Sequence, residues 1–265
     1  MSAVIGFDLE DLISVSLSNE NSHGILIGAT GSGKTSGSAK AISHAFLRAG
    51  YGGLVLCAMP SERDQWLKAA AECGRSNSVI VFDGSGKHRI NFLDYELSRS
   101  DTSYAKVFNA VRLLTHILDA AAGKQGAETT ESGFWRDSMG ELLTNAITML
   151  HHARGTVTLA SMMKLINQRP RSIDQLLSER WTDASLWGRT VRRAKKRPVH
   201  PLDPADYAAM HEWWATVFLS DDARTPSNVV STVSAKLSPF LTGRMREIFA
   251  TTTTILAVRN SLNIK

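Results

Sequence analysis

The sequence predicts an α/β fold that carries a helical insertion, and two observations lead to this fold class. Over the first 94 residues, short apolar runs alternate with helix-like segments, in the order 24–27, 34–49, 54–57, 62–73 and 79–82. This strand–helix–strand–helix–strand order is typical of a parallel sheet covered by helices. From about residue 101 to residue 152, apolar residues instead recur at helical spacing, which predicts two helices separated by a polar loop.

Particular residues predict where each of the first helices and strands begins or ends. The first apolar run ends in a glycine-rich turn, and three glycines at 50, 52 and 53 end the helix that follows. Ser61 is the predicted N-cap of the second helix. The run at 79–82 is β-branched and aromatic, as strands commonly are.

The later part of the chain predicts further helices. Their ranges are 158–167, 172–180, 206–219 and a mixed apolar segment at 229–250 that Pro239 and Gly243 interrupt. A proline-rich loop or hinge separates some of them, at 198–204.

Composition excludes several classes of protein. The 265 residues are 43% apolar and 21% charged, which is globular usage. Two cysteines give no disulfide framework and favour a reducing compartment. No apolar run approaches the roughly 18–20 residues that span a bilayer, and the first ten residues do not resemble a secretory signal. We therefore expect a cytoplasmic protein.

The net charge of +5 is unevenly distributed. Residues 1–180 hold 18 basic and 18 acidic side chains, whereas residues 181–265 hold 12 basic and 7 acidic ones. The excess therefore lies near the C-terminus, which permits an anionic partner such as nucleic acid.

The strongest motif is a complete phosphate loop, G-x-x-x-x-G-K-[ST]. It is formed by Gly28, Ala29, Thr30, Gly31, Ser32, Gly33, Lys34 and Thr35. Its glycines permit positive φ and bring backbone amides close to an anion, and a helix predicted to start at about Lys34 would direct its amides at the phosphates. Lys34 would reach the β- and γ-phosphates of ATP, and the Thr35 hydroxyl would bind Mg²⁺. The alternative is a tight glycine turn without a ligand.

The rest of a nucleotide site is harder to find. Asp83 ends the third apolar run and could be the metal-side acid, but we favour a turn residue there. The sequence has no N-K-x-D motif, which GTPases use to recognise guanine, so a GTPase is not favoured. No apolar strand ends in an Asp-Glu pair. His211 begins a sequence that lacks the second histidine of the H-E-x-x-H zinc helix, so no metal site is predicted there.

A basic run is the second candidate site. It contains Arg189, Arg192, Arg193, Lys195, Lys196 and Arg197. On a helix, these cations would surround most of the circumference. They form either a solvated segment or a salt-sensitive, sequence-independent contact with the DNA backbone.

Several stretches resemble the coupling-protein ATPases of type IV secretion and conjugation, which belong to the superfamily of hexameric DNA translocases. They follow the family's order and are spread over nearly the whole length of the chain: residues 21–35, 54–63, 79–83 with 88–95, 133–137 and 228–249. The phosphate loop is shared by many NTPases, whereas the stretch at 89–95 is more particular. Met59 departs from the family, which usually has lysine there.

The resemblance implies a truncated RecA-like P-loop NTPase sheet with an inserted all-α domain. Residues 1–98 would begin the nucleotide-binding domain, residues 99–222 would form the insertion, and residues 223–265 would return to the first domain. ATP and Mg²⁺ are the implied cofactors. Single-stranded DNA, a relaxase and secretion-channel proteins are the implied partners of a homo-hexameric motor, either cytoplasmic or peripheral to the inner membrane through partners.

Members of this family are longer, and their Walker B strand follows the point where this sequence stops. We therefore expect a truncated or frameshifted product that keeps the Lys34 and Thr35 side of the site. Two functions follow from this expectation. The protein is either an ATP-driven DNA-transfer motor or a catalytically incomplete fragment that binds nucleotide or DNA without turnover.

Overall fold

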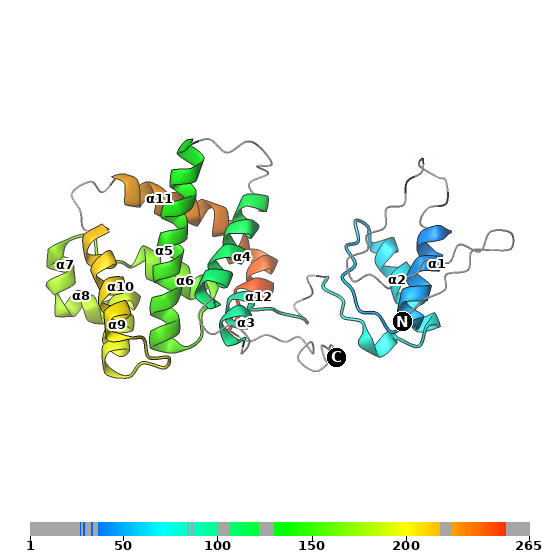
Figure 1. The fold of residues 1–265 in the computed structure, drawn as a ribbon, viewed down its shortest axis with the longest axis horizontal. Coiled ribbons are helices and arrows are strands. Elements are labelled where there is room, and N and C mark those ends of the chain that lie inside the picture. The colour runs from blue at the N-terminus through cyan, green and yellow to red at the C-terminus, as the bar shows by residue number, and fades with distance from the viewer. Residues whose placement is uncertain are drawn as a thin grey trace. The chain divides into compact units, whose positions relative to one another are not determined.

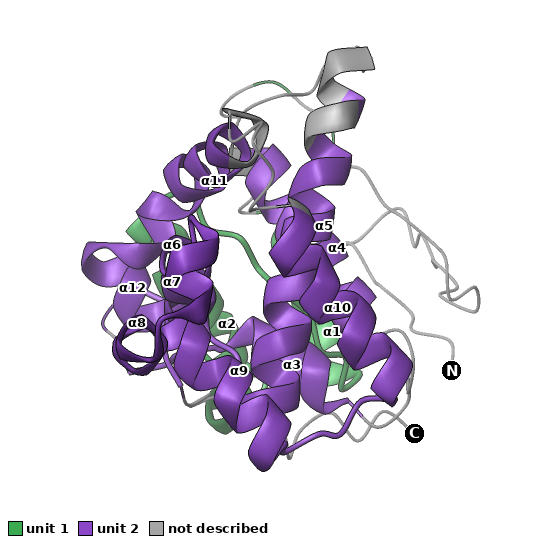
Figure 2. Cartoon of the chain, turned by 90° about the vertical axis from the view of Figure 1, so that its left-hand side faces the viewer, with its two compact units in different colours: residues 1–81 green, residues 82–265 purple. Residues whose placement is uncertain are grey.

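The structure is a computed structural model that describes residues 27, 29, 33, 37–83, 85, 87–99, 106–121, 130–217 and 224–252. The chain divides into an N-terminal unit, residues 1–81, and a C-terminal unit, residues 82–265 (Figure 2). Each unit is described by itself, and the domain boundaries expected at 98 and 222 stay predictions. None of the helices in the described ranges has the length and apolar character needed to cross a membrane.

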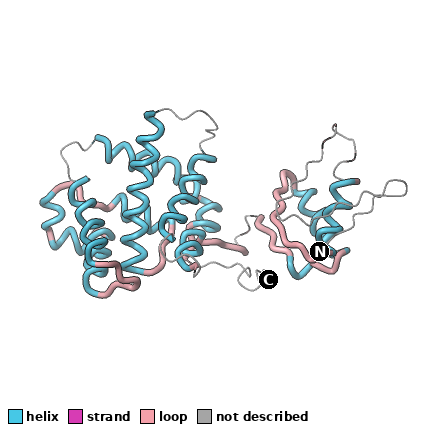
Figure 3. Tube along the Cα trace, in the orientation of Figure 1, coloured by secondary structure: helices cyan, strands magenta, loops and turns pink. Residues whose placement is uncertain are grey.

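The predicted α/β fold with a RecA-like sheet is wrong, because the described residues form helices and loops but no strand (Figure 3). Residues 54–57 and 79–82 run as loops, and Leu54 and Leu56 are each 85% exposed. A strand requires backbone pairing with a second extended segment, which apolar composition alone cannot supply. In the described part of the chain, neither run has such a partner. The predicted strand at 24–27 lies outside the described residues except for Ile27.

The N-terminal unit contains α1 (Ser38–Arg48), α2 (Pro60–Glu72) and the short 3-10 helix η1 (Ser76–Ser78). The predicted N-cap at Ser61 is wrong, because α2 already begins at Pro60. A proline fits the first helical position, since no intrahelical donor is lost there. The Glu62 carboxylate accepts hydrogen bonds from the backbone amides of Ala58 at 2.7 Å and Met59 at 3.3 Å.

The ends of α1 and α2 are joined by polar contacts. The Arg75 guanidinium donates to the Leu47 carbonyl at 3.0 Å, and the His44 ring lies 3.5 Å from the Glu72 carboxylate. The carbonyl at the end of a helix needs a donor from outside, and Arg75 supplies one to α1.

The C-terminal unit is a set of packed helices (Figure 1). They are α3 (Phe92–Ser98), α4 (Lys106–Ala121), α5 (Thr130–Arg154), α6 (Leu159–Asn167), α7 (Ile173–Leu177), α8 (Glu179–Ala184), α9 (Leu186–Lys196), α10 (Pro204–Val217), α11 (Arg224–Leu237), the 3-10 helix η2 (Ser238–Leu241) and α12 (Gly243–Phe249). These bounds confirm the helices predicted within 101–152 and at 158–167 and 206–219.

Helix α5 is the centre of this unit, because it packs against α4, α6, α9, α10 and α11. Its inner face consists of fully buried apolar side chains, including Leu142, Leu143, Ala146, Ile147 and Leu150. Burying one leucine side chain stabilises a fold by roughly 1.5–3 kcal/mol, so this stripe explains the position of α5.

Three serines divide the next part of the chain into short helices. Ser172, Ser178 and Ser185 are the N-caps of α7, α8 and α9, and each hydroxyl accepts a hydrogen bond from an amide in the following turn. The single helix predicted at 172–180 is therefore wrong. Ser178 has an extended backbone at the C-cap of α7, and its side chain caps the start of α8.

Candidate functional site: the phosphate loop and the basic helix α9

The phosphate loop is only partly described. Ala29 and Gly33 fall within the described residues, whereas Gly28, Thr30, Gly31, Ser32, Lys34 and Thr35 lie outside them. The ATP and Mg²⁺ contacts assigned to these residues stay predictions. Gly33 has φ of +81°, a conformation that glycine adopts without strain, and this confirms the positive φ predicted at that position.

Helix α1 begins later than predicted, at Ser38 rather than at about Lys34. Gly37 has a non-helical backbone, with φ of −102° and ψ of −99°, and its amide donates to the Gly33 carbonyl at 2.7 Å. A Cβ atom on Gly37 would lie 3.0 Å from that carbonyl oxygen. The Gly33 carbonyl therefore lies against the Gly37 residue that directly precedes α1.

The N-terminus of α1 is suited to an anion. It has no side-chain N-cap, and no acidic residue occupies its first turn. The first amides of a helix need acceptors from outside, and the helix dipole favours a negative charge there. These features are what the phosphate-loop motif requires of the helix that follows it.

Helix α9 keeps one face buried, whereas the basic run predicted cations around most of its circumference. Leu186, Trp187, Thr190 and Ala194 are buried, and Thr190 is fully inaccessible. All six predicted DNA-binding cations are exposed instead: Arg189, Arg192, Arg193, Lys195, Lys196 and Arg197. By helical geometry, they occupy about half of the circumference.

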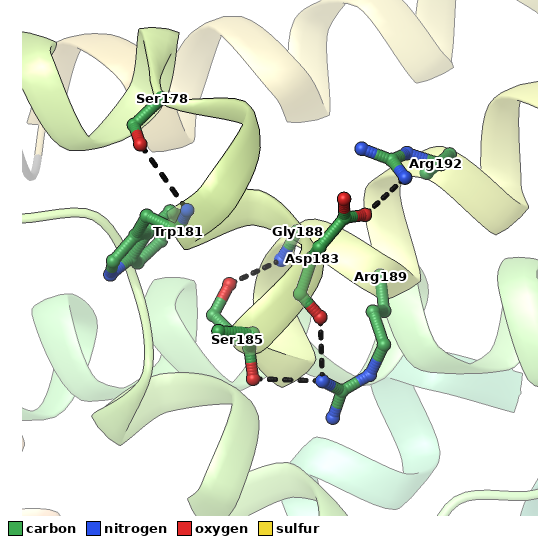
Figure 4. A network of polar contacts seen from close by, with 8 residues as sticks. Ser178, Trp181, Asp183, Ser185, Gly188, Arg189 and Arg192 are labelled. Carbon is green, nitrogen blue, oxygen red and sulfur yellow. Dashed lines mark hydrogen bonds and ion pairs between the residues drawn. The ribbon is translucent and has the colours of Figure 1, made fainter.

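Three of these cations have partners within the protein. Arg189 donates to the carbonyls of Asp183 at 2.9 Å and Ala184 at 2.8 Å, at the end of α8, and Arg192 pairs with the Asp183 carboxylate (Figure 4). Arg193 donates to the Ala153 carbonyl, near the end of α5, at 2.9 Å. Arg189 and Arg193 bind carbonyls at helix C-termini, which is an ordinary structural use of a cation.

The other three cations lie at the C-terminal end of the helix. The side chains of Lys195, Lys196 and Arg197 make no hydrogen bond or ion pair with any described part of the chain. They are the members of the basic run best placed to bind a polyanion.

One cation of this surface, Arg154, lies outside the predicted basic run. Arg154, at the end of α5, donates to the Thr190 hydroxyl at 3.3 Å, which places it beside α9. Burial lowers the pKa of Arg154, and the positive charges of Arg193 and Arg189 lower it further. A basic residue in the last turn of a long helix was the available signal, but its pairing with α9 depends on tertiary packing.

The remaining sequence candidates have structural explanations. The Asp83 carboxylate accepts a hydrogen bond from the Ser85 amide at 3.0 Å, which confirms that Asp83 lies in a turn. Within the described ranges, no group of histidine, cysteine or acidic side chains could hold a metal ion, and His211 is no exception.

The candidate sites lie in different units of the chain, the phosphate loop in residues 1–81 and α9 in residues 82–265. Their expected chemistry is distinct, since the predicted phosphate loop would offer backbone amides and a lysine, whereas α9 presents an exposed row of cations. No protein-family model matches this chain, and no curated protein or solved structure was found to match it.

Proposed function

We propose that this protein binds ATP with Mg²⁺ through residues 28–35 and takes part in DNA transfer as a nucleotide-binding component. One observation carries the proposal, which is the complete phosphate-loop motif directly before the uncapped N-terminus of α1. Two glycines support it. Gly33 has a positive φ, and Gly37 lies too close to the Gly33 carbonyl for a Cβ atom to fit without a shift.

The proposed roles follow from side-chain chemistry. Lys34 places a positive charge against the β- and γ-phosphates, and Thr35 provides a hydroxyl ligand for Mg²⁺. The backbone amides of the loop and of α1 contribute hydrogen bonds and partial positive charge. Binding by these groups does not require an acidic side chain, whereas the ATPases that the sequence resembles use the Asp-Glu pair of their Walker B strand to polarise the attacking water.

The exposed cations of α9 are the proposed contact with DNA. Lys195, Lys196 and Arg197 would bind phosphates without reading sequence. Three such contacts on a single strand give a slope of about −2 for log K against log salt concentration. Single-stranded DNA, a relaxase and secretion-channel proteins belong to this proposal as the partners that the family resemblance implies.

A second candidate function is nucleotide or DNA binding without turnover. The sequence contains no apolar run that ends in an Asp-Glu pair, and Asp83 is held in a turn. A site that lacks these acids would bind nucleotide without activating water efficiently.

A fluorescent ATP analogue, titrated with Mg²⁺ present, tests the proposal. We expect Lys34→Ala to weaken binding at least about tenfold, because a charge-assisted contact with phosphate is lost. Lys40→Ala is the matched control, since Lys40 is an exposed lysine of α1 outside the motif. Equal binding by the two variants would refute a phosphate-loop site.

Phosphate release separates the two candidate functions. A motor would release phosphate faster when single-stranded DNA is added, and Lys34→Ala would abolish the stimulation. A binding protein without turnover would bind the analogue but release no phosphate with or without DNA.

A further inference from the structure

A cavity of about 350 Å³ lies in the C-terminal unit, where α6 ends and α7, α8 and α9 begin. Its volume is within the range of about 300–1,000 Å³ that small-molecule sites occupy. Arg169 and Arg171 line it, together with the carboxamides of Asn167, Gln168 and Gln175 and one side of Trp181. None of the residues that line it carries a carboxylate.

Two of the three carboxamide oxygens that line this cavity already accept hydrogen bonds. The Gln168 oxygen accepts from the Leu186 amide at 2.6 Å, and the Gln175 oxygen accepts from the Arg171 amide at 2.9 Å. Their NH₂ groups remain as donors. The Ser185 hydroxyl oxygen likewise accepts from the Gly188 amide at 3.0 Å, which leaves its proton to donate (Figure 4). The polar side chains of the cavity therefore favour an acceptor-rich ligand.

Arg169 provides a fixed positive charge beside the cavity. It is only 8% exposed, and its guanidinium donates to the Ile166 carbonyl at 3.2 Å. Burial lowers the pKa of Arg169, and the positive charge of Arg171 lowers it further. A negative ligand between the two arginines would offset both effects.

We infer that this cavity binds a phosphate group. A phosphate presents three or more acceptor oxygens, which suits two guanidinium groups and several amide donors better than the two oxygens of a carboxylate do. Trp181 gives the cavity an apolar wall against which a sugar or a base can pack. The site goes beyond the proposed function, because it lies outside residues 28–35 and uses none of the six cations of the basic run.

The phosphate could belong to a free phosphate ester or to the backbone of a nucleic acid. Isothermal titration calorimetry with three probes distinguishes these sources: inorganic phosphate, thymidine monophosphate and an oligothymidylate. All titrations use the Lys34→Ala background, which removes the phosphate loop as a second anion site. A failure of the phosphate-loop proposal would therefore leave this result unchanged.

Arg171→Gln is the test variant, because Arg171 is exposed and its loss leaves the helix packing intact. Arg180→Gln is the matched control, since Arg180 is an exposed arginine of the neighbouring α8 that does not line the cavity. We expect Arg171→Gln to weaken binding about tenfold or more and Arg180→Gln to leave it within about twofold.

Each outcome decides the inference. Weaker binding of inorganic phosphate and the monophosphate in Arg171→Gln supports a site for a free phosphate ester. Weaker binding of the oligothymidylate alone supports a contact with a nucleic-acid backbone. Equal affinities in Arg171→Gln and Arg180→Gln, or no binding of any probe by the parent protein, would overturn the inference.

Discussion

The two units differ in how they cover their apolar side chains. In the C-terminal unit, large side chains from several helices are fully buried, among them Leu93, Leu114, Leu150 and Trp214. In the described part of the N-terminal unit, Ala69 and Ala70 are the buried hydrophobic residues, and Leu54 and Leu56 are exposed. Among the described residues, the unit that contains the candidate phosphate loop therefore has the smaller core.

This contrast reflects the difference between local and non-local hydrogen bonding. A helix pairs its own amides and carbonyls, so an amphipathic sequence needs only one apolar surface to pack against. A strand must find a partner segment elsewhere. The described part of the C-terminal unit is built from helices whose packed faces bury large apolar side chains, whereas residues 54–57 of the N-terminal unit are exposed.

The first prediction compares the same substitution in both units. Leu150→Ala should lower the free energy of unfolding by about 2–5 kcal/mol, because it opens a cavity in a fully buried site. Leu56→Ala should change it by no more than about 0.5 kcal/mol, because the side chain is 85% exposed. Urea unfolding followed by tryptophan fluorescence measures the first loss well, since five of the six tryptophans lie in residues 82–265.

Circular dichroism at 222 nm follows the helices of both units, so it would also detect unfolding of the N-terminal unit that tryptophan fluorescence misses. A loss at Leu56→Ala comparable with that at Leu150→Ala would contradict the comparison, because it would mean that residues 54–57 are packed.

The same distinction decides what the sequence could predict. Helical spacing correctly located α4, α5, α6 and α10, since the pattern and the hydrogen bonds of a helix are both local. Residues 54–57 and 79–82 have the composition of strands, but composition does not specify a partner. Ser178 shows a third limit, because a capping serine inside an apolar pattern divided one predicted helix into two.

In the candidate sites too, local features were predictable from the sequence and contacts between helices were not. The positive φ of Gly33 was predictable from the motif, and the basic run was visible as six nearby cations. The sequence did not reveal that Arg189 and Arg193 bind helix C-termini, or that Arg154 joins this surface. These facts depend on which helices pack together.

The second prediction tests close helix packing within the C-terminal unit. A Cβ atom on Gly188 of α9 would lie 2.5 Å from the Cα atom of Thr182 in α8, so the helices could not keep their approach. Gly188→Ala should therefore lower the free energy of unfolding by about 1–3 kcal/mol. Gly140→Ala is the control, because nothing lies within 4 Å of the added atom in α5.

Alanine has the higher helix propensity, so the control should stabilise the protein by up to about 1 kcal/mol in the same urea titration. Stabilisation by both variants would show that helix propensity, rather than the contact between α8 and α9, decides the outcome.

The third and smallest predicted effect concerns pH. Burial lowers the pKa of His151 below its usual 6.5, and the nearby charges of His200, Lys106 and His152 lower it further, although the Gly155 carbonyl opposes this shift. Below pH 6.5 the unfolded chain then binds more protons than the folded chain does. The free energy of unfolding is therefore unaffected by the titration of His151 above pH 6.5, and it decreases as the pH falls below that value.

Thermal unfolding at pH 7.5 and pH 5.5 measures this contribution. The unmodified protein should lose more thermal stability between the two values than His151→Gln does, because glutamine does not titrate. His116→Gln, at an exposed position of α4, should keep the full pH dependence. If His151→Gln and His116→Gln lost equal stability on acidification, the acid sensitivity would arise from other groups, and the packing of α5 would not depend on a neutral His151.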